Sequence, residues 1–471
     1  MWWLLTIALA GPRAPSAPSA PSAPEPASQA SVLAADPLSE DGLAAAAAVV
    51  IPLVEKHAGK AFVAQPAIDL AEGPAFAKVV SEENRLIYDR VFAASPEAVR
   101  RRLAEQAGAA SQYAVLGKYG IQTDTLYMAP EPLKLAAARV GEDRLADVVM
   151  VIMAHELTHA LQDQHMPFEG LLAQVRDQDH LHAASGSWEG FATWVEQQVA
   201  AELGLTEVFW ELTAVQGWGR EGLQNPMAFD VWASYGQGRR FVEHHHAQGV
   251  DHLWNVLAHP PSDTAMLFHP DQWRAEVSPA PVDFTPALTG AEAKLTSKRE
   301  WATLITTVGN QELRGEAILG HTEGELDELM AHLVYGQKLE AVLPDRAVQV
   351  RAMLFDDPQW PRRYLELLRA QGSADAERKQ EAYSVPIEVS YEPYALEGLV
   401  IDDATLRTSR TPVGGGRHIE ERSAWVVRDR LVLVVTAERF RPGLRMGWAI
   451  QHVLDGLQQV VLPAASPGDA P

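Results

Sequence analysis

The residues best suited to chemistry lie in one short segment, Val148 to His165, which reads VVMVIMAHELTHALQDQH. Within it His155 and His159 stand four residues apart, and Glu156 directly follows the first histidine. On an α-helix, residues four apart lie one turn along and about 40° apart around the axis, so both imidazoles can converge on one cation. Glu156 can then reach a metal-bound water without ligating the metal. The H-E-x-x-H pattern therefore predicts a metal-dependent hydrolytic site.

The ligand chemistry favours zinc as the metal. The chain has no cysteine, which excludes disulfides, thiolate metal sites, iron–sulfur clusters and cysteine nucleophiles. Neutral imidazoles without thiolates favour Zn²⁺ among the available metals, although not exclusively. The seven residues before His155 are apolar, as expected of a buried helix that carries a site into a core. The alternative is a helix whose two histidines face solvent.

A catalytic zinc needs a third protein ligand and an open coordination position. His165 follows His159 by six residues, which is the spacing of the last histidine in H-E-x-x-H-x-x-G-x-x-H. The glycine that ends the helix in that pattern is replaced here by Gln162. A continuing helix would turn His165 by about 240° away from the metal-facing side. We therefore expect His165 to be a polar residue at the helix end.

The second candidate for the third ligand is Glu189, in the segment SWEGFATWVE at 187–196. This segment resembles the part of the gluzincin metallopeptidases in which a glutamate followed by Gly-Phe-Ala is the third zinc ligand. HELTHALQDQH with a downstream E-G-x-A-T also resembles a group of bacterial metallopeptidases. The resemblance implies a zincin-like core in which His155, His159 and Glu189 hold one Zn²⁺. Glu196, two turns further along the same face, is a fallback ligand or a carboxylate that supports one.

A third motif is Ser234-Tyr235-Gly236-Gln237-Gly238, which resembles the Ser-Tyr-x-Lys-Gly helix of gluzincin aminopeptidases. The resemblance implies that Tyr235 donates a hydrogen bond to the developing oxyanion, because zinc alone neutralises that charge only in part. Gln237 stands where the pattern has lysine, and a packing role for Tyr235 remains the alternative. The chain lacks the Gly-x-Met-Glu-Asn segment that helps to hold the substrate amine in those enzymes, which favours an endopeptidase.

Other polar residues lie close to these motifs in the sequence. Asp163 is one turn beyond His159, where it can orient an imidazole. The acidic and histidine residues between Asp177 and His182 could hold a second cation, but a polar loop is the simpler interpretation. Successive residues of His244–His246 point about 100° apart on a helix, which favours a solvated surface.

The order of the elements predicts an α+β fold with a mainly helical core. Helices are predicted at Ser39–Lys56, from Ser95-Pro96-Glu97 to Ala107, and at Glu142–Gln164, His180–Leu203 and Phe229–Gln248. The β-branched and aromatic segment Tyr113–Met128 has a polar break at Gln122–Asp124, which predicts a β-hairpin upstream of the active helix. Gluzincins pair an extended substrate with an edge strand in this place, so the resemblance gives that role to Thr125–Met128.

The chain is predicted to divide near residue 285. Residues 32–285 form the expected metallopeptidase domain, and residues 286–471 form an α+β region that contains no chemical motif. In that second region Tyr383–Glu392 and Trp425–Thr436 alternate like strands, while Met446–Leu457 has the pattern of a closing helix.

The first residues predict export. Residues 1–10 have the apolar run and the small-x-small ending of a short signal peptide, although no lysine or arginine precedes the run. Residues 11–31 are rich in Pro, Ala and Ser and are typical of an extended tether. No apolar run reaches the length of about 20 residues that a transmembrane helix needs. We expect a periplasmic, envelope or extracellular protein, and a cytoplasmic one if the short segment is not a signal.

Charge narrows the choice of partners. The chain carries 39 Lys and Arg against 62 Asp and Glu, a net charge of −23, which would repel the phosphates of a nucleic acid. We expect a zinc-dependent endopeptidase with protein or peptide substrates. One alternative is a non-catalytic exported envelope or binding protein on the same scaffold, and another is a hydrolase of non-peptide amides. The presence of Glu156 argues against the first alternative, since holding a metal does not require a general base.

Overall fold

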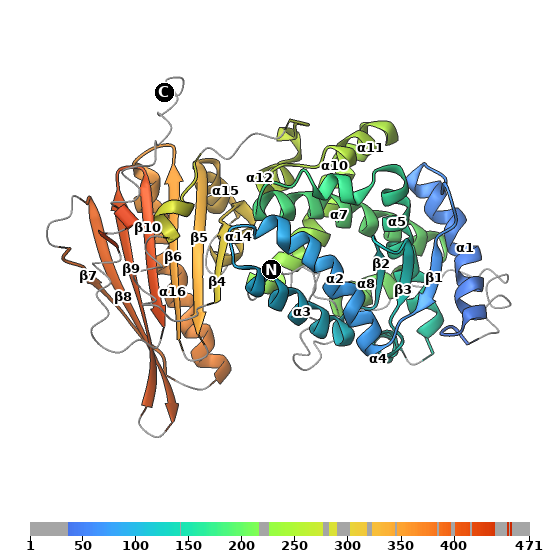
Figure 1. Cartoon of the computed structure of the whole chain (residues 1–471), viewed down its shortest axis with the longest axis horizontal. Helices are drawn as coiled ribbons and strands as arrows, with labels where there is room; N and C mark the ends of the chain where they lie inside the picture. The colour runs from blue at the N-terminus through green and yellow to red at the C-terminus, as the bar shows by residue number, and fades with distance from the viewer. Residues whose placement is uncertain are drawn as a thin grey trace.

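The computed structural model describes most of the chain from residue 36 onward and confirms the predicted α+β fold. It consists of a helical region that carries a small sheet, followed by a seven-stranded sheet with its own helices (Figure 1). The described residues are 36–141, 143–215, 226–276, 282–289, 302–317, 323–343, 346–383, 386–396, 401–414, 417–438, 450–451 and 453–454.

The helical region confirms four of the five helices predicted from the sequence, whereas the fifth, Phe229–Gln248, is two α-helices separated by a π turn. Its helices are α1 (Glu40–Ala58), α2 (Gly73–Val91), α3 (Glu97–Ala114), α4 (Pro130–Val140), α5 (Leu145–His165), α6 (Phe168–Leu172), α7 (Gln178–Glu202), α8 (Thr206–Val215), α9 (Pro226–Trp232), α10 (Gly238–His246), α11 (Val250–Ala258) and α12 (Thr264–Phe268). A π turn, η2 (Ala233–Gln237), joins α9 to α10, and a 3₁₀ turn, η3 (Pro270–Gln272), follows α12.

Two helix starts illustrate how local sequence acts. Ser39 caps α1, and its hydroxyl oxygen accepts a hydrogen bond from the Gly42 N–H at 3.1 Å, as predicted. Ser95 does not cap α3. Its hydroxyl oxygen instead accepts a hydrogen bond from the N–H of Ile305, which lies in the sheet region. α3 also runs to Ala114, well beyond the predicted end at Ala107, so the start of the predicted hairpin is helical.

The helices α5 and α7 form the centre of the helical core. α5 is apolar on almost every side before His155, and a helix of this kind must be surrounded by other elements to leave water. The residues Val148 to Ala154 are all buried, as are most residues of α7. α10 packs very closely on α7, because a Cβ atom on Gly238 would lie only 2.0 Å from the Gly186 carbonyl oxygen.

The small sheet confirms the predicted hairpin but not the predicted edge strand. Its strands are β1 (Ala67–Leu70), β2 (Gly117–Gly120) and β3 (Thr125–Met128), in the order β1-β3-β2. β3 pairs with β2 on one side and in parallel with β1 on the other, so both of its edges are occupied. The expectation that Thr125–Met128 pairs with a substrate is therefore wrong. β1, which the sequence does not link to β3, pairs with the edge of β3 where the substrate was expected. The strand edge beside α5 belongs to β2.

The second region is an antiparallel sheet in the order β4-β5-β6-β10-β9-β8-β7. Its strands are β4 (Ala302–Thr307), β5 (Leu333–Leu343), β6 (Arg346–Phe355), β7 (Glu388–Pro393), β8 (Asp403–Gly414), β9 (Arg417–Arg428) and β10 (Leu431–Glu438), and its helices are α14 (Asn310–Ala317), α15 (Glu323–Ala331) and α16 (Gln359–Tyr383).

Two predicted strands in this region differ from the structure. The predicted strand Trp425–Thr436 is the end of β9 and the start of β10, because Asp429 adopts a left-handed conformation with φ 52° and reverses the chain. The predicted strand Tyr383–Glu392 begins only at Glu388, since α16 continues to Tyr383. Apolar alternation does not reveal either boundary.

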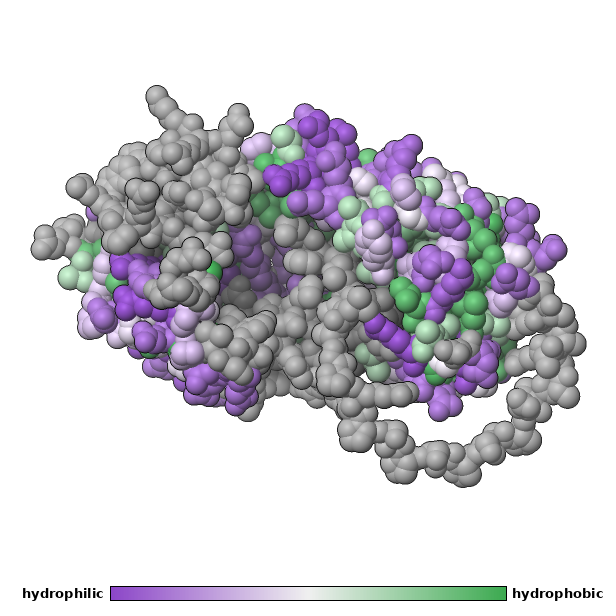
Figure 2. Space-filling view, turned by 90° about the horizontal axis from the view of Figure 1, so that it is seen from below, coloured by the Kyte–Doolittle hydropathy of each residue, from purple (hydrophilic) through white to green (hydrophobic). Residues whose placement is uncertain are grey.

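Some predictions fall where the structure makes no statement. The predicted signal peptide at 1–10 and tether at 11–31 lie outside the described residues, as does most of Met446–Leu457. Among the residues that are described, no helix is long and apolar enough to cross a membrane. The face seen in Figure 2 is mainly hydrophilic over the described residues, with hydrophobic residues gathered over part of the helical region.

Candidate metal centre

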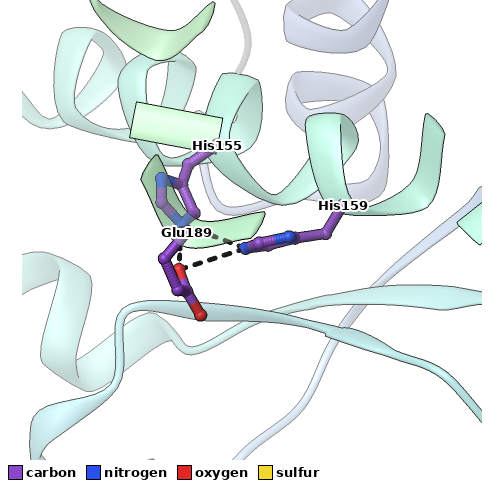
Figure 3. Close-up of side chains that lie close together, drawn as sticks. All are labelled: His155, His159 and Glu189. Atoms are coloured by element: carbon purple, nitrogen blue, oxygen red, sulfur yellow. Dashed lines mark hydrogen bonds and ion pairs between the residues drawn. The ribbon is translucent and has the colours of Figure 1, made fainter. Parts of the chain in front are cut away.

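Three side chains from two helices converge in the helical core. His155 and His159 extend from α5, and Glu189 reaches them from α7 (Figure 3). The Nε2 atoms of the two histidines lie 3.2 Å apart, and Glu189 Oε2 lies 3.1 Å from His155 Nε2 and 3.3 Å from His159 Nε2. His155 is buried, while His159 and Glu189 are half-buried. The site is therefore inside the protein but is not sealed from solvent.

Both imidazole rings are oriented by a partner on the opposite nitrogen. His155 Nδ1 lies 3.0 Å from Glu196 Oε2, and His159 Nδ1 lies 2.8 Å from Gln162 Oε1. The Gln162 amide is itself fixed, because its Nε2 donates a hydrogen bond to the Trp188 carbonyl oxygen. With the Nδ1 atoms donating, both Nε2 atoms are left with lone pairs that face the shared position.

This arrangement can hold a metal ion. Two imidazole lone pairs and one carboxylate oxygen are all acceptors, and such a cluster needs positive charge between its members. Ligands at 2.0–2.1 Å from a tetrahedral zinc are separated from one another by about 3.3–3.4 Å. The observed separations of 3.1–3.3 Å are close to that value. The donor set and its spacing therefore fit a divalent cation, and both histidines have the orienting partners that metal ligands usually have.

The carboxylates and histidines of the site shift one another's pKa values in the direction that favours a bound positive charge. Burial raises the pKa of Glu189, but His159 and His155 outweigh burial and hold that pKa well below the usual range. Burial lowers the pKa of His155, whereas its hydrogen bonds to Glu189 and Glu196 raise that pKa well above the ordinary value. A buried histidine between two carboxylates stabilises either a proton or a metal ion at this position.

Glu156 follows the first residue of the metal group, which consists of His155, His159 and Glu189, and its carboxylate is held by β2. Its Oε2 atom accepts a hydrogen bond from the Tyr119 backbone N–H at 2.7 Å. The close approach favours a glycine at position 117, because a Cβ atom there would lie 3.1 Å from Glu156 Cγ and 3.0 Å from Ile152 Cγ2. A main-chain donor and a missing side chain thus fix the direction of this carboxylate.

A basic residue of β2 also lies near the site. Lys118 donates a 2.7 Å hydrogen bond to the buried carboxylate of Glu83 on α2. Burial lowers the pKa of Lys118, but Glu83, with smaller contributions from Glu156 and Glu189, raises it above the ordinary value. The lysine therefore stays charged and offsets part of the negative charge of the site.

Tyr235 lies over the metal group from the π turn η2. Its ring centroid is 5.9 Å from that of His155. Burial and the charges of Glu189 and Glu156 hold the pKa of its hydroxyl well above the ordinary value. The phenol is therefore neutral at physiological pH and can act as a hydrogen-bond donor.

The other sequence candidates have different roles. His165 donates a 2.8 Å hydrogen bond to the Ala61 carbonyl oxygen and is not part of the metal group. The expectation that Asp163 orients an imidazole is wrong: its carboxylate accepts hydrogen bonds from the Phe168 N–H and the Tyr119 hydroxyl. Gln162, three positions beyond His159 on α5, contacts the imidazole ring, whereas Asp163, four positions beyond, makes its hydrogen bonds elsewhere.

Two further interpretations are tested by the described residues. No second group of three metal-binding side chains occurs in the described part of the chain, and Asp179 instead accepts hydrogen bonds from Thr264. The interpretation of His244–His246 as a solvated surface is wrong for His245, which is 2% exposed and hydrogen-bonded to His252. Sequential histidines point in different directions on a helix, so one of them turns inward.

Sequence reasoning missed three contributors to the site. The spacing of three residues between His159 and Gln162 on a predicted helix is a signal that could have identified Gln162 as a partner. No sequence pattern identifies the Tyr119 N–H or the nearby charge of Lys118 as part of the site, since both depend on how β2 packs against α5.

Comparisons with known proteins leave the family open. No family model matches the chain, and no curated protein is significantly similar to it in sequence. Among solved structures it is similar to a protein of Chloroflexus aurantiacus that is described as a candidate hydrolase with a novel fold. The two are 18% identical, the match covers 52% of this chain and 92% of the other, and the TM-score is 0.36. So low a structural similarity supports no conclusion about this chain.

Proposed function

We propose that this chain is a zinc-dependent hydrolase of peptide bonds, a metallopeptidase of the gluzincin type that acts as an endopeptidase. The observation that carries the proposal is the convergence of His155, His159 and Glu189 on one point, together with Glu156, which follows His155 on α5 and whose carboxylate is held by the Tyr119 N–H. A site that only stored a metal would not need a further carboxylate held in place by a backbone N–H.

His155, His159 and Glu189 would hold the ion. Zinc, when bound, supplies a Lewis acid that polarises a substrate carbonyl and makes water a better nucleophile. Glu196 and Gln162 keep the two imidazoles turned toward the ion. The ion would have three protein ligands, which is the number found in other catalytic zinc sites.

Glu156 acts as the general base and then as the general acid. Its carboxylate accepts a proton from the attacking water and passes it to the nitrogen of the leaving amine. The Tyr119 N–H keeps one oxygen of Glu156 engaged at 2.7 Å, so the other oxygen is the one available for proton transfer.

Tyr235 donates a hydrogen bond to the carbonyl oxygen as negative charge develops on it. Its high pKa keeps the proton on the phenol, and its position beside His155 supports this role. A donor that is already in place stabilises this charge without reorganisation. We also propose that the enzyme acts outside the cytoplasm, on the basis of the signal-like segment at 1–10.

Metal content and peptidase activity measured on one preparation test the proposal. The purified protein should contain about one zinc per chain and release fragments from unfolded protein substrates, and a chelator should abolish this activity until zinc is restored. A zinc-loaded protein that cleaves no peptide bond would favour the alternative of a non-catalytic binding protein. Cleavage of simple amides without release of peptide fragments would favour the other alternative.

A further inference from the structure

Tyr235 lies in the least regular part of its helix. The π turn η2 has backbone hydrogen bonds that span five residues instead of four. Such turns are rare in proteins, and those that occur are often at functional sites. The direction of the Tyr235 side chain therefore depends on the contacts that hold the two ends of this turn.

The downstream end of η2 is held within the helical region. Gln237 Nε2 donates a 3.1 Å hydrogen bond to the Leu267 carbonyl oxygen. The next residue, Gly238, lies directly against Gly186 and Gly190 of α7. This end is thus fixed to the helix that carries Glu189.

The helix that leads into η2, α9, is held by a helix of the sheet region. Gln311 Nε2, on α14, donates a 3.1 Å hydrogen bond to the Asp230 carboxylate, five residues before Tyr235. Gly315 of α14 faces the Phe229 ring, and a Cβ atom at that glycine would lie 3.0 Å from the ring. Figure 1 shows α14 at the boundary between the sheet and the helical region.

The same residue, Gln311, is also connected to α7. Its backbone N–H donates a 2.9 Å hydrogen bond to the Thr264 hydroxyl oxygen, and that hydroxyl donates to Asp179 Oδ1 at 2.5 Å. Asp179 lies on α7, ten residues before Glu189. Gln311 therefore joins the helix of the phenol to the helix of the metal ligand.

The burial of Gln311 indicates that its amide serves this connection. The residue is 1% exposed, and its Oε1 atom is buried with no hydrogen-bond partner among the described residues. An unsatisfied buried carbonyl destabilises the fold, and an apolar side chain of similar size would avoid it. The Nε2 donor to Asp230 is the one feature that such a replacement would lose.

We propose that Gln311 is a positioning residue, through which α14 of the sheet region sets the place of Tyr235 relative to Glu189. It acts through Asp230 and touches no substrate. This inference rests on the proposed function for its kinetic consequence, but the position of the phenol can be measured without any turnover.

The direct test is ¹⁹F NMR of the full chain labelled with 3-fluorotyrosine. The resonance that disappears in Tyr235→Phe is that of Tyr235. Gln311→Met, which keeps the length of the side chain but removes the donor, should shift or broaden this resonance. The double variant Asp230→Asn with Gln311→Glu reverses donor and acceptor and should restore it. The matched control is Gln349→Met, because Gln349 makes a similar 2.8 Å bond to Glu340 within the sheet, and it should leave the resonance unchanged.

The kinetic test separates positioning from general support of the fold. Gln311→Met should lower kcat by up to about 10²-fold, the loss that a misplacement of about 1 Å can cause, with KM and bound zinc unchanged. In a Tyr235→Phe background the same change should have little further effect. An unmoved Tyr235 resonance, or equal losses of kcat in both backgrounds, would overturn the inference. A wild-type chain that cleaves no peptide would instead refute the proposed function, while the NMR result would still test the position of Tyr235.

Discussion

Glu196 lies directly behind His155, with Glu196 Oε2 3.0 Å from His155 Nδ1 and the carboxylate only 1% exposed. Burial raises the pKa of Glu196, whereas its hydrogen bond to His155 lowers it, and the net pKa stays above the ordinary value. The hydrogen bond therefore fixes the imidazole ring in a direction that suits metal binding, against the cost of burying the carboxylate. The sequence left Glu196 as a fallback ligand or as a carboxylate that supports one, and the contact to His155 Nδ1 favours the supporting role.

Replacement of Glu196 should weaken metal binding without abolishing it. Glu196→Gln keeps the shape but loses the charge that orients and polarises His155, so zinc affinity should fall by about 10–100-fold. Competition with a chromophoric chelator measures this change. Glu202→Gln, on the same helix but with an exposed ion pair to Lys56, is the matched control and should bind zinc normally. A normal affinity in Glu196→Gln would show that the contact does not support the ligand.

Replacement of Glu156 should separate metal binding from turnover. Glu156→Gln removes the group that accepts the proton but leaves all three ligands, so the variant should retain zinc and lose most of its activity. Metal analysis and peptide-release kinetics on one sample provide the measurement. Full activity in this variant would exclude Glu156 as the general base.

The third ligand can be identified by a pair of variants. Glu189→Ala removes one of the three converging atoms, and it should lose zinc at sub-micromolar free metal. His165→Ala removes only the contact to the Ala61 carbonyl, so it should retain zinc and lose little activity. If instead His165→Ala lost zinc and Glu189→Ala retained it, the third ligand would be His165.

The hydroxyl of Tyr235 should act mainly in the transition state. Tyr235→Phe keeps the ring beside His155 and should lower kcat by about 10²–10³-fold. The KM and the zinc content should change little, because the hydrogen bond to the oxyanion forms only in the transition state. Melting temperature measured on the same variant distinguishes catalysis from packing, since a packing role would lower stability and leave kcat near normal.

Stability should depend on pH through Asp179. Burial raises the pKa of this carboxyl to about 7, and the nearby charge of Asp263 adds to the effect. The folded chain therefore binds a proton that the unfolded chain has already lost above about pH 4. This contribution to stability is fully present below about pH 4 and is lost as pH rises through about 7, with a slope of at most about 1.4 kcal/mol per pH unit.

Chemical denaturation between pH 5 and 8 measures this effect. Asp179→Asn keeps a carbonyl acceptor for Thr264 but cannot titrate, so the variant should lose this part of the pH dependence and gain stability relative to wild type as pH rises. An unchanged pH profile would mean that Asp179 titrates near its ordinary pKa in the folded chain.

The sequence alone determined the elements whose signals are local. Helical periodicity and the apolar run before His155 predicted α5, and the polar break at Gln122–Asp124 predicted the turn between β2 and β3. The spacing of His155 and His159 predicted a shared metal position, because one helix turn fixes their separation. The predictions of α5 and of the turn are confirmed, because each depends on residues within about one to three turns of the same chain segment.

Only the tertiary structure decided how separate segments meet. It decided that Glu196 contacts His155 Nδ1 and lies outside the group of His155, His159 and Glu189, because that depends on how α7 packs on α5. The tertiary structure also decided that β3 is the central strand of its sheet, since β1, more than fifty residues earlier in the chain, pairs with the side of β3 that β2 leaves open. It placed Gln311 against Asp230, 81 positions away in the sequence. Packing between distant segments leaves no periodic pattern in either of them, so the residues around the metal group that come from other elements became visible only in the fold.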